Sequence, residues 1–174
     1  MKLLLKVITI LFVTIALFYL LVPVPDFPEP PLGAVQSFEP ADTETPQRRA
    51  YFTDLNREAV IDSYVQQFSF LPYLRLNYPP EEAQTIIRDQ TRSYYLEEIV
   101  QPLRSSFYVN GFVPQEEKDA VIVDGVEYYQ KITVRYIPSS PIVRVSVFVA
   151  SIFVLIFIVR EWSDSVKILW PRKK

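Results

Sequence analysis

The chain has 174 residues, and its formal net charge of −2 conceals an uneven distribution. Residues 23–143 carry eighteen acidic and ten basic side chains, a net charge of about −8, whereas both chain ends are basic. The sequence contains no cysteine, no histidine and only three glycines. Disulfides, thiol nucleophiles, histidine-dependent triads and glycine-rich phosphate loops are therefore excluded. We expect no catalytic residue, no cofactor and no metal site, and the acidic middle disfavours nucleic acid as a partner.

The first predicted element is an apolar helix at the N-terminus. Sixteen uncharged residues run from Val7 to Val22. If Lys6 extends to the membrane interface, the twenty residues that begin at Leu3 cover the roughly 30 Å hydrocarbon layer of a bilayer. A cleaved secretory signal is the alternative, but the bulky, proline-rich residues that follow are not typical of a cleavage site. We predict an uncleaved transmembrane anchor over residues 1–22.

A proline-rich acidic segment, residues 23–48, comes next. Its first twenty-five residues contain seven prolines and five carboxylates. Proline fixes φ and removes an amide donor, so this composition predicts an extended, polyproline-like spacer. A proline-rich ligand for an aromatic groove is the alternative interpretation.

Residues 49–138 predict a folded domain that begins with helices. A first helix is expected to start near Thr53 or Asp54, because either side chain can cap it. Its apolar positions recur at helical spacing: Leu55, Ile61, Tyr64, Val65 and Phe68. A second helix is expected over residues 80–91, where a proline at the first position precedes two glutamates.

The pattern then changes to that of strands. Residues 93–100 and 105–113 are rich in β-formers and are interrupted by Pro102, while Asn110-Gly111 suggests a turn. Asp124-Gly125 is the clearest hairpin signal. After it, alternate positions form one apolar side: Val126, Tyr128, Ile132, Val134 and Tyr136. The sequence therefore predicts an α+β domain, in which two helices precede a small antiparallel sheet.

A second transmembrane helix is predicted over residues 142–160, followed by a basic tail, residues 161–174. Fifteen uncharged residues without a turn signal exceed the length of an ordinary strand. Basic and aromatic side chains are expected to anchor the two spans at the membrane interfaces: Lys6, Arg144, Arg160, Trp162 and Trp170. Lysines and arginines are concentrated outside the spans at both chain ends, which predicts that both termini are cytoplasmic and the domain is extracytoplasmic.

Two further sets of residues suggest contacts. Ser146 and Ala150 are four residues apart in the second span, a spacing that lets membrane helices approach closely. Each of the pairs Tyr94-Tyr95 and Tyr128-Tyr129 places one ring on each side of a strand. The outward rings, expected to be Tyr95 and Tyr129, are candidates for contact with a partner.

A membrane-anchored hydrolase is the alternative function. Glu97 and Glu98 are adjacent on a strand and should point to opposite faces, which disfavours them as a catalytic pair. Glu116, Glu117 and Asp119 are typical of a solvated loop, with weak Ca²⁺ binding as a further possibility. A Ser–Lys dyad needs no histidine, and its candidates are Ser93, Ser105 or Ser106 with Lys118 or Lys131.

The layout resembles that of polysaccharide chain-length regulators. These have two spans, both ends inside and a proline-containing stretch before the second span, here "IPSSP", residues 137–141. The middle region of this chain lacks their long helices, and we do not assign it to that family. The sequence predicts a two-span protein of a prokaryotic plasma membrane that displays its domain as a structural or interaction component. Its expected partners are the lipid bilayer and other envelope proteins, or a second copy of the chain.

Overall fold

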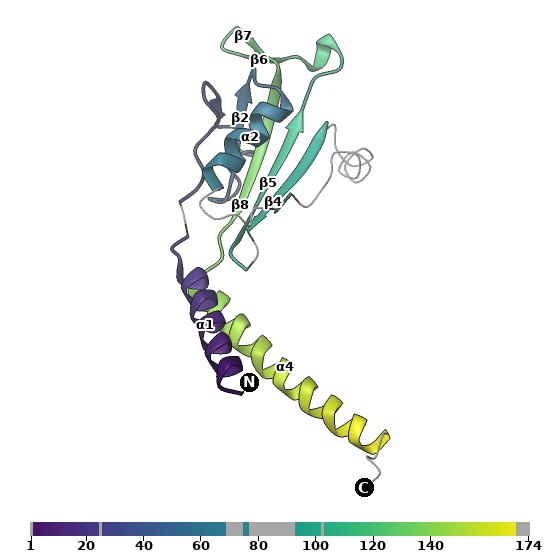
Figure 1. Ribbon diagram of the computed structural model, residues 1–174. Coiled ribbons are helices and arrows are strands. Elements are labelled where there is room, and N and C mark those ends of the chain that lie inside the picture. Colours follow the sequence, from purple (N-terminus) through teal and green to yellow (C-terminus); the bar gives the residue numbers. More distant parts are fainter. Residues whose placement is uncertain (1, 25, 69–74, 77–92, 102, 170–174) are drawn as a thin grey trace. The chain divides into compact units, whose positions relative to one another are not determined.

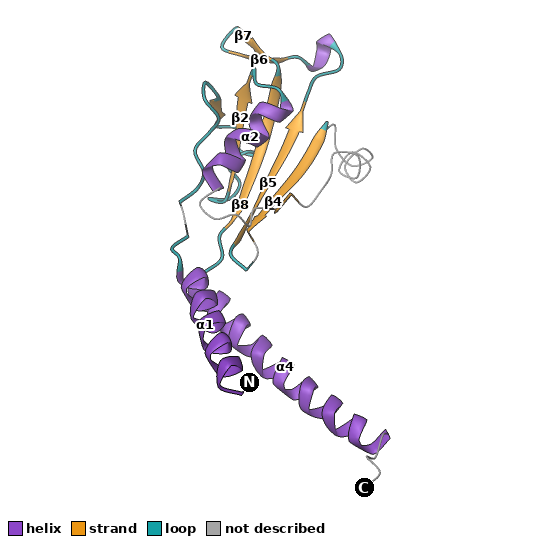
Figure 2. Cartoon of the chain, viewed as in Figure 1, coloured by secondary structure: helices purple, strands orange, loops and turns teal. Residues whose placement is uncertain are grey.

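The computed structural model describes residues 2–24, 26–68, 75–76, 93–101 and 103–169 (Figure 1). The chain divides into two units, which are described separately. Unit 1 consists of Met1–Pro23 and Ser140–Lys174, and unit 2 consists of Val24–Ser139. Unit 2 combines helix and antiparallel sheet, as Figure 2 shows, so the predicted α+β content is confirmed.

The sheet of unit 2 has six strands among the described residues, and every neighbouring pair is antiparallel. Its order across the sheet is β1 (Val35–Ser37), β2 (Arg48–Thr53), β8 (Gln130–Ile137), β5 (Ser105–Phe112), β4 (Tyr95–Gln101) and β3 (Arg75–Leu76). The strands β6 (Val121–Val123) and β7 (Val126–Tyr128) form a separate hairpin. Strand β8 is central because it pairs with both β2 and β5.

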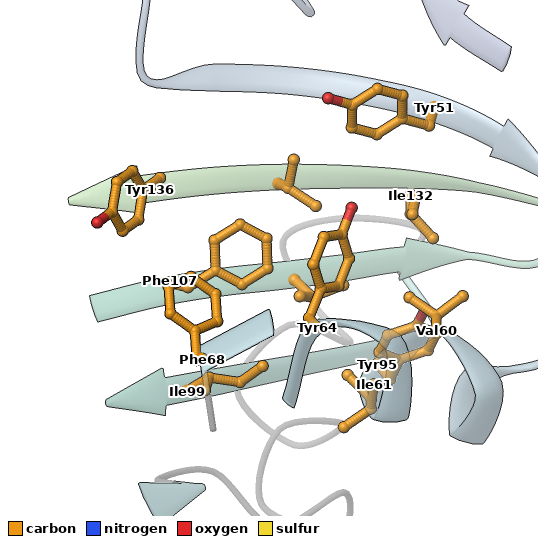
Figure 3. Close-up of a cluster of buried hydrophobic side chains, with 12 residues drawn as sticks. Tyr51, Val60, Ile61, Tyr64, Phe68, Tyr95, Ile99, Phe107, Ile132 and Tyr136 are labelled. Atoms are coloured by element: carbon orange, nitrogen blue, oxygen red, sulfur yellow. The ribbon is translucent and has the colours of Figure 1, made fainter. Parts of the chain in front are cut away.

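Within the described part of unit 2, helix α2 covers one face of this sheet. Helix α2 (Arg57–Phe68) buries Val60, Ile61, Tyr64 and Phe68. Opposite them lie alternate residues of the strands, and Figure 3 shows rings from both layers interleaving. The Tyr64 and Phe107 rings have centroids 4.5 Å apart, and those of Phe68 and Phe107 are 5.4 Å apart. Burying such rings stabilises the fold by about 25 cal/mol per Å² of apolar surface.

The predicted cap of this helix, Thr53 or Asp54, was two or three residues too early. The segment of Thr53 is strand rather than helix, because it pairs with Gln130 of β8. Its hydroxyl accepts a hydrogen bond from the Leu55 amide at 3.2 Å, which closes the turn between strand and helix. The helix cap is Asn56, whose side-chain oxygen accepts a hydrogen bond from the Ala59 amide at 2.9 Å. The predicted second helix, residues 80–91, lies outside the described residues.

The two predicted turns had opposite outcomes. Asp124-Gly125 joins β6 to β7 with φ of 51° and 80°, the left-handed pair that a two-residue hairpin requires. The prediction of a turn at Asn110-Gly111 was wrong, because both residues lie within β5. Gly111 is opposite Tyr95 across the strand pair, and a Cβ added there would overlap the Tyr95 ring. Glycine is therefore needed here so that an aromatic ring can lie on the backbone.

The proline-rich segment is not a plain spacer. Two strands, β1 and β2, precede α2, so the predicted order of helices before sheet does not hold at the start of unit 2. Before β1, Phe27 packs on Tyr136 with ring centroids 6.1 Å apart. The Glu29 backbone also exchanges two hydrogen bonds, of 2.9 and 3.0 Å, with the Gln67 side chain of α2. Residues between the prolines thus form strand β1 and pack on the domain.

Gly111→Ala is expected to destabilise unit 2 by about 1–3 kcal/mol, because the added methyl group forces the buried Tyr95 ring to move. The midpoint of urea unfolding, followed by circular dichroism of the full chain in detergent, measures the change. In a Tyr95→Ala background the same substitution should cost much less. An unchanged midpoint for Gly111→Ala alone contradicts the close packing.

Candidate functional site

Two apolar helices make up unit 1. Helix α1 is Lys2–Leu21 and helix α4 is Pro141–Leu169, and both contain a segment long and apolar enough to cross a membrane, Leu3–Leu21 and Pro141–Val166. Proline sets both boundaries: Pro23 disfavours helix at the preceding residue, and Pro141 occupies the tolerated first position of α4. At 1.5 Å per residue the two segments are about 29 and 39 Å long. Helix α4 thus continues beyond the predicted span and includes part of the predicted tail.

The apolar side chains of these helices are exposed along most of their length. Phe18 of α1 is 77% exposed and Phe153 of α4 is 68% exposed. Apolar rings on the surface of a water-soluble protein would form an unusually large contiguous patch. The same surface is favourable when hydrocarbon surrounds it.

The two helices are joined by Arg144, in the first turn of α4. One of its guanidinium nitrogens donates a hydrogen bond to the Val22 carbonyl at the end of α1, at 2.9 Å. Arg144 does not extend into solvent, because it is only 2% exposed, and its role as an interfacial anchor stays a prediction. The last carbonyls of a helix have no partner within it and carry partial negative charge, so they attract a cation. The α1 end therefore binds this arginine.

The other proposed anchors and small residues lie on exposed helix surfaces. Lys6, Arg160 and Trp162 are exposed, whereas Trp170 lies outside the described residues. Ser146 and Ala150 are also exposed. A surface groove of about 460 Å³ runs along α4 and includes Ala150 but not Ser146, with the lining Val147, Ala150, Ser151, Val154, Leu155 and Ile158. Helix association through Ser146 and Ala150 stays a prediction.

In unit 2, polar side chains gather where β2 turns into α2. Arg57, the first helical residue, forms an ion pair with Glu97 of β4, which is 1% exposed. The Arg57 guanidinium also lies 5.8 Å from the centroid of the Tyr95 ring. Glu98 is buried as well, but strand alternation places it on the other face of the sheet. The two glutamates are therefore not a catalytic pair, as the sequence indicated.

The same corner is tied to β8. The Gln130 side chain donates a hydrogen bond to the Leu55 carbonyl at 2.5 Å, and the Tyr129 amide donates one to Asp54 at 3.0 Å. At the opposite end of α2, the Gln101 side chain donates to the carbonyl of Phe68, the last helical residue, at 2.6 Å. Helix α2 is thus attached to β4 at both ends, by Glu97 and by Gln101.

Three buried tyrosines lie between this helix and the sheet. Tyr51, Tyr64 and Tyr95 are each no more than 1% exposed. Burial raises the pKa of all three phenols, because the charged form would lose its hydration. For Tyr64, the neighbouring Tyr51 and Tyr95 phenols raise the pKa further. These groups remain neutral hydrogen-bonding phenols near pH 7.

The two tyrosines proposed as partner contacts differ in exposure. Tyr95 is buried, so its selection as an outward ring was wrong, and Tyr94 is the exposed member of that pair at 46%. The strand begins at Tyr95, whose side chain points to the α2 side. Tyr129 is 51% exposed and remains a candidate for contact. Sequence alternation alone did not reveal which ring of the first pair faces α2.

A second polar cluster holds residues 37–42 on the sheet. The Ser37 hydroxyl donates to Asp42 at 2.6 Å, and Lys131 of β8 contacts Asp42 at 2.7 Å and Glu39 at 2.9 Å. Burial lowers the pKa of Lys131, but the two carboxylates outweigh that effect and the net pKa is raised. A lysine in this state is protonated, so it cannot serve as the base of a Ser–Lys dyad. Lys118, the other candidate, pairs with Glu116.

Glu116, Glu117 and Asp119 lie in an exposed to half-buried loop that includes a short 3₁₀ turn, Glu117–Asp119. Within the described ranges, no three potential metal ligands come together. Comparisons with models of protein families, with curated proteins and with solved structures find no match to this chain.

Replacing Arg144 should loosen the joint between α1 and α4. With Val22→Cys and Val143→Cys in the cysteine-free chain, we expect a flexible bis-maleimide to cross-link the helix ends efficiently. Arg144→Leu should reduce the cross-linked fraction severalfold, because a charge-assisted hydrogen bond contributes about 1.5–3 kcal/mol. Arg144→Lys should retain most of it. Arg160→Leu, which removes a charge from a different part of α4, is the matched control, and equal effects of the two leucine variants would contradict the joint.

The buried phenols predict a two-stage alkaline titration. Their folded-state pKa values lie above the unfolded value of about 10, so the phenols bind their protons more tightly in the folded state. Their contribution to the free energy of unfolding is therefore complete below pH 10. It is lost as the pH rises above 10. Tyrosinate absorbance should therefore rise first for exposed phenols and then in step with loss of circular dichroism. Ionisation of all eleven tyrosines before unfolding would show that the three are accessible.

Proposed function

We propose that the chain is a two-span integral membrane protein that displays unit 2 outside the cytoplasm as a structural or interaction component of a cell envelope or membrane complex. The observation that carries the proposal is the contrast between the units. Unit 2 buries its own apolar core, whereas α1 and α4 leave theirs uncovered at both ends of the chain. A helix of about 20 apolar residues satisfies its own backbone and is stable in hydrocarbon.

The distribution of basic residues supports the proposed orientation. Lys2 and Lys6 lie at the start of α1, and five basic residues, beginning with Arg160, follow the apolar part of α4. Such residues are retained on the cytoplasmic side. On the domain side, Arg144 is bound to the α1 carbonyl end rather than exposed. Between the spans, the acidic residues outnumber the basic ones and contribute little to orientation.

Two features of unit 2 support an interaction role. Tyr94 and Tyr129 expose about half of their surface, and tyrosine is enriched at protein interfaces because an apolar ring carries a polar tip. The net negative charge keeps such a domain soluble and directs it toward basic partners. The ion pairs of Lys131 with Asp42 and of Arg57 with Glu97 attach segments of unit 2 to one another, which favours this role over the hydrolase alternative.

Single cysteines test the topology, because the natural chain has none. Gln115→Cys lies in an exposed loop of unit 2, and Ser163→Cys lies on an exposed part of α4. A membrane-impermeant maleimide should label the first in spheroplasts and the second only after the membrane is disrupted. The unsubstituted chain is the control and should remain unlabelled.

The reverse labelling pattern would overturn the orientation, and extraction of the chain from vesicles by alkaline carbonate would overturn membrane insertion. The interaction role is tested separately by light scattering after purification in mild detergent. We expect a particle that contains more protein than one 20.3 kDa chain. A monomer without partners would contradict the interaction role while leaving the topology intact.

A further inference from the structure

Four polar side-chain atoms beneath α2 have no hydrogen-bond partner in the part of the chain that the structure describes. They are the hydroxyls of Tyr51, Tyr64 and Tyr95 and the side-chain carbonyl of Gln130. Each of the four residues is at most 1% exposed. Burying such a group without a partner is unfavourable, and more than 90% of buried polar groups are hydrogen-bonded in folded proteins.

These atoms belong to one cluster of neighbouring side chains. Tyr51 and Gln130 lie two positions apart along the paired strands β2 and β8, because Tyr51 is opposite Ile132 and Thr53 is opposite Gln130. Figure 3 shows the Tyr64 ring rising from α2 with its hydroxyl toward β2, where Tyr51 lies. The phenol of Tyr64 interacts electrostatically with those of Tyr51 and Tyr95. The Gln130 side chain approaches the Tyr95 phenol closely enough to lower its pKa, and Arg49 has the same effect on Tyr51.

The chemistry of the cluster fits a small neutral ligand. Each phenol can donate one hydrogen bond and accept others, and the Gln130 carbonyl is an acceptor only, because its amide nitrogen already donates to Leu55. Among the charged side chains near these phenols, Arg57 is paired with Glu97, and Arg49 lies beside the Tyr51 phenol. Water has the matching donors and acceptors and typically makes about three hydrogen bonds in a protein interior.

We propose that unit 2 contains a buried water site formed by Tyr51, Tyr64, Tyr95 and Gln130. Bound water links α2 to β2, β4 and β8 by hydrogen bonds that the side chains do not make directly. Because the bridges are directional, they fix how α2 lies on the sheet in a way that ring packing alone does not.

Tyr64→Phe tests the proposal through the sign of the stability change. If water bridges the hydroxyl, the substitution removes a hydrogen bond, and the midpoint of thermal unfolding should fall by about 4–8 °C for a domain of this size. If the hydroxyl is dry and unpaired, its removal relieves a penalty and the midpoint rises. The measurement uses near-ultraviolet circular dichroism of the full chain in detergent. A rise or no change would overturn the water site.

A double-mutant cycle and a control complete the test. The losses of stability caused by Tyr51→Phe and by Tyr64→Phe should add up to more than the loss in the double variant, because both substitutions remove partners of the same bound water. Additive losses would contradict a shared site. Tyr129→Phe removes an exposed hydroxyl and should leave the midpoint unchanged. A crystal structure of unsubstituted protein should show water within 3.2 Å of at least two of the four atoms, and direct side-chain contacts in its place would overturn the proposal.

Discussion

The attachment of α2 to β4 is the contact on which the rest of unit 2 depends. Among the described residues, the twelve-residue helix α2 covers the apolar face of a six-stranded sheet, so its position decides which side chains are buried. Glu97 binds its first residue and Gln101 its last carbonyl, and four strand positions separate them. Charge and hydrogen bonding thus set both ends, while the rings of Tyr64, Phe68 and Phe107 fill the space between. Leaving Glu97 without Arg57 would expose a buried carboxylate to an apolar surrounding, which is far costlier than the loss of one surface ion pair.

Sequence patterns predicted the elements whose local signals agree with the fold. Asp124-Gly125 specified a turn, and the alternation at Ile132, Val134 and Tyr136 specified a buried strand face, because neither depends on distant residues. Asn110-Gly111 carried the same kind of turn signal, but Gly111 is needed because the Tyr95 ring of another strand lies against its backbone. Local sequence does not show a requirement of this tertiary kind. The same reason explains Tyr95. Which of two adjacent tyrosines is buried depends on where α2 lies. The position of α2 depends in turn on the ion pair between Arg57 and Glu97, which are forty residues apart in the sequence.

The acidic proline-rich segment shows how composition can mislead. Its prolines correctly exclude helix, but they do not exclude docking by the residues between them. Phe27 contacts Arg49 and Tyr136 on one side of the sheet, and Asp42 binds Lys131 on the other. Strand β1 lies between Phe27 and Asp42 in the sequence and pairs with β2 at the edge of the sheet. The segment therefore covers an edge that would otherwise present unpaired amides and carbonyls, a common need of open sheets.

Arg144 lies where the two apolar helices meet. If α1 and α4 cross a membrane, as proposed, a guanidinium close to hydrocarbon must keep hydrogen-bond partners, and the carbonyl end of α1 supplies one. The hydrogen bond to Val22 joins the last turn of α1 to the first turn of α4. In the proposed bilayer, lipid offers no hydrophobic driving force for helix association, so a polar contact of this kind would have more influence on a two-helix unit than apolar packing of equal area. The isolated arginine at the start of the second apolar run is then explained as a link between helices.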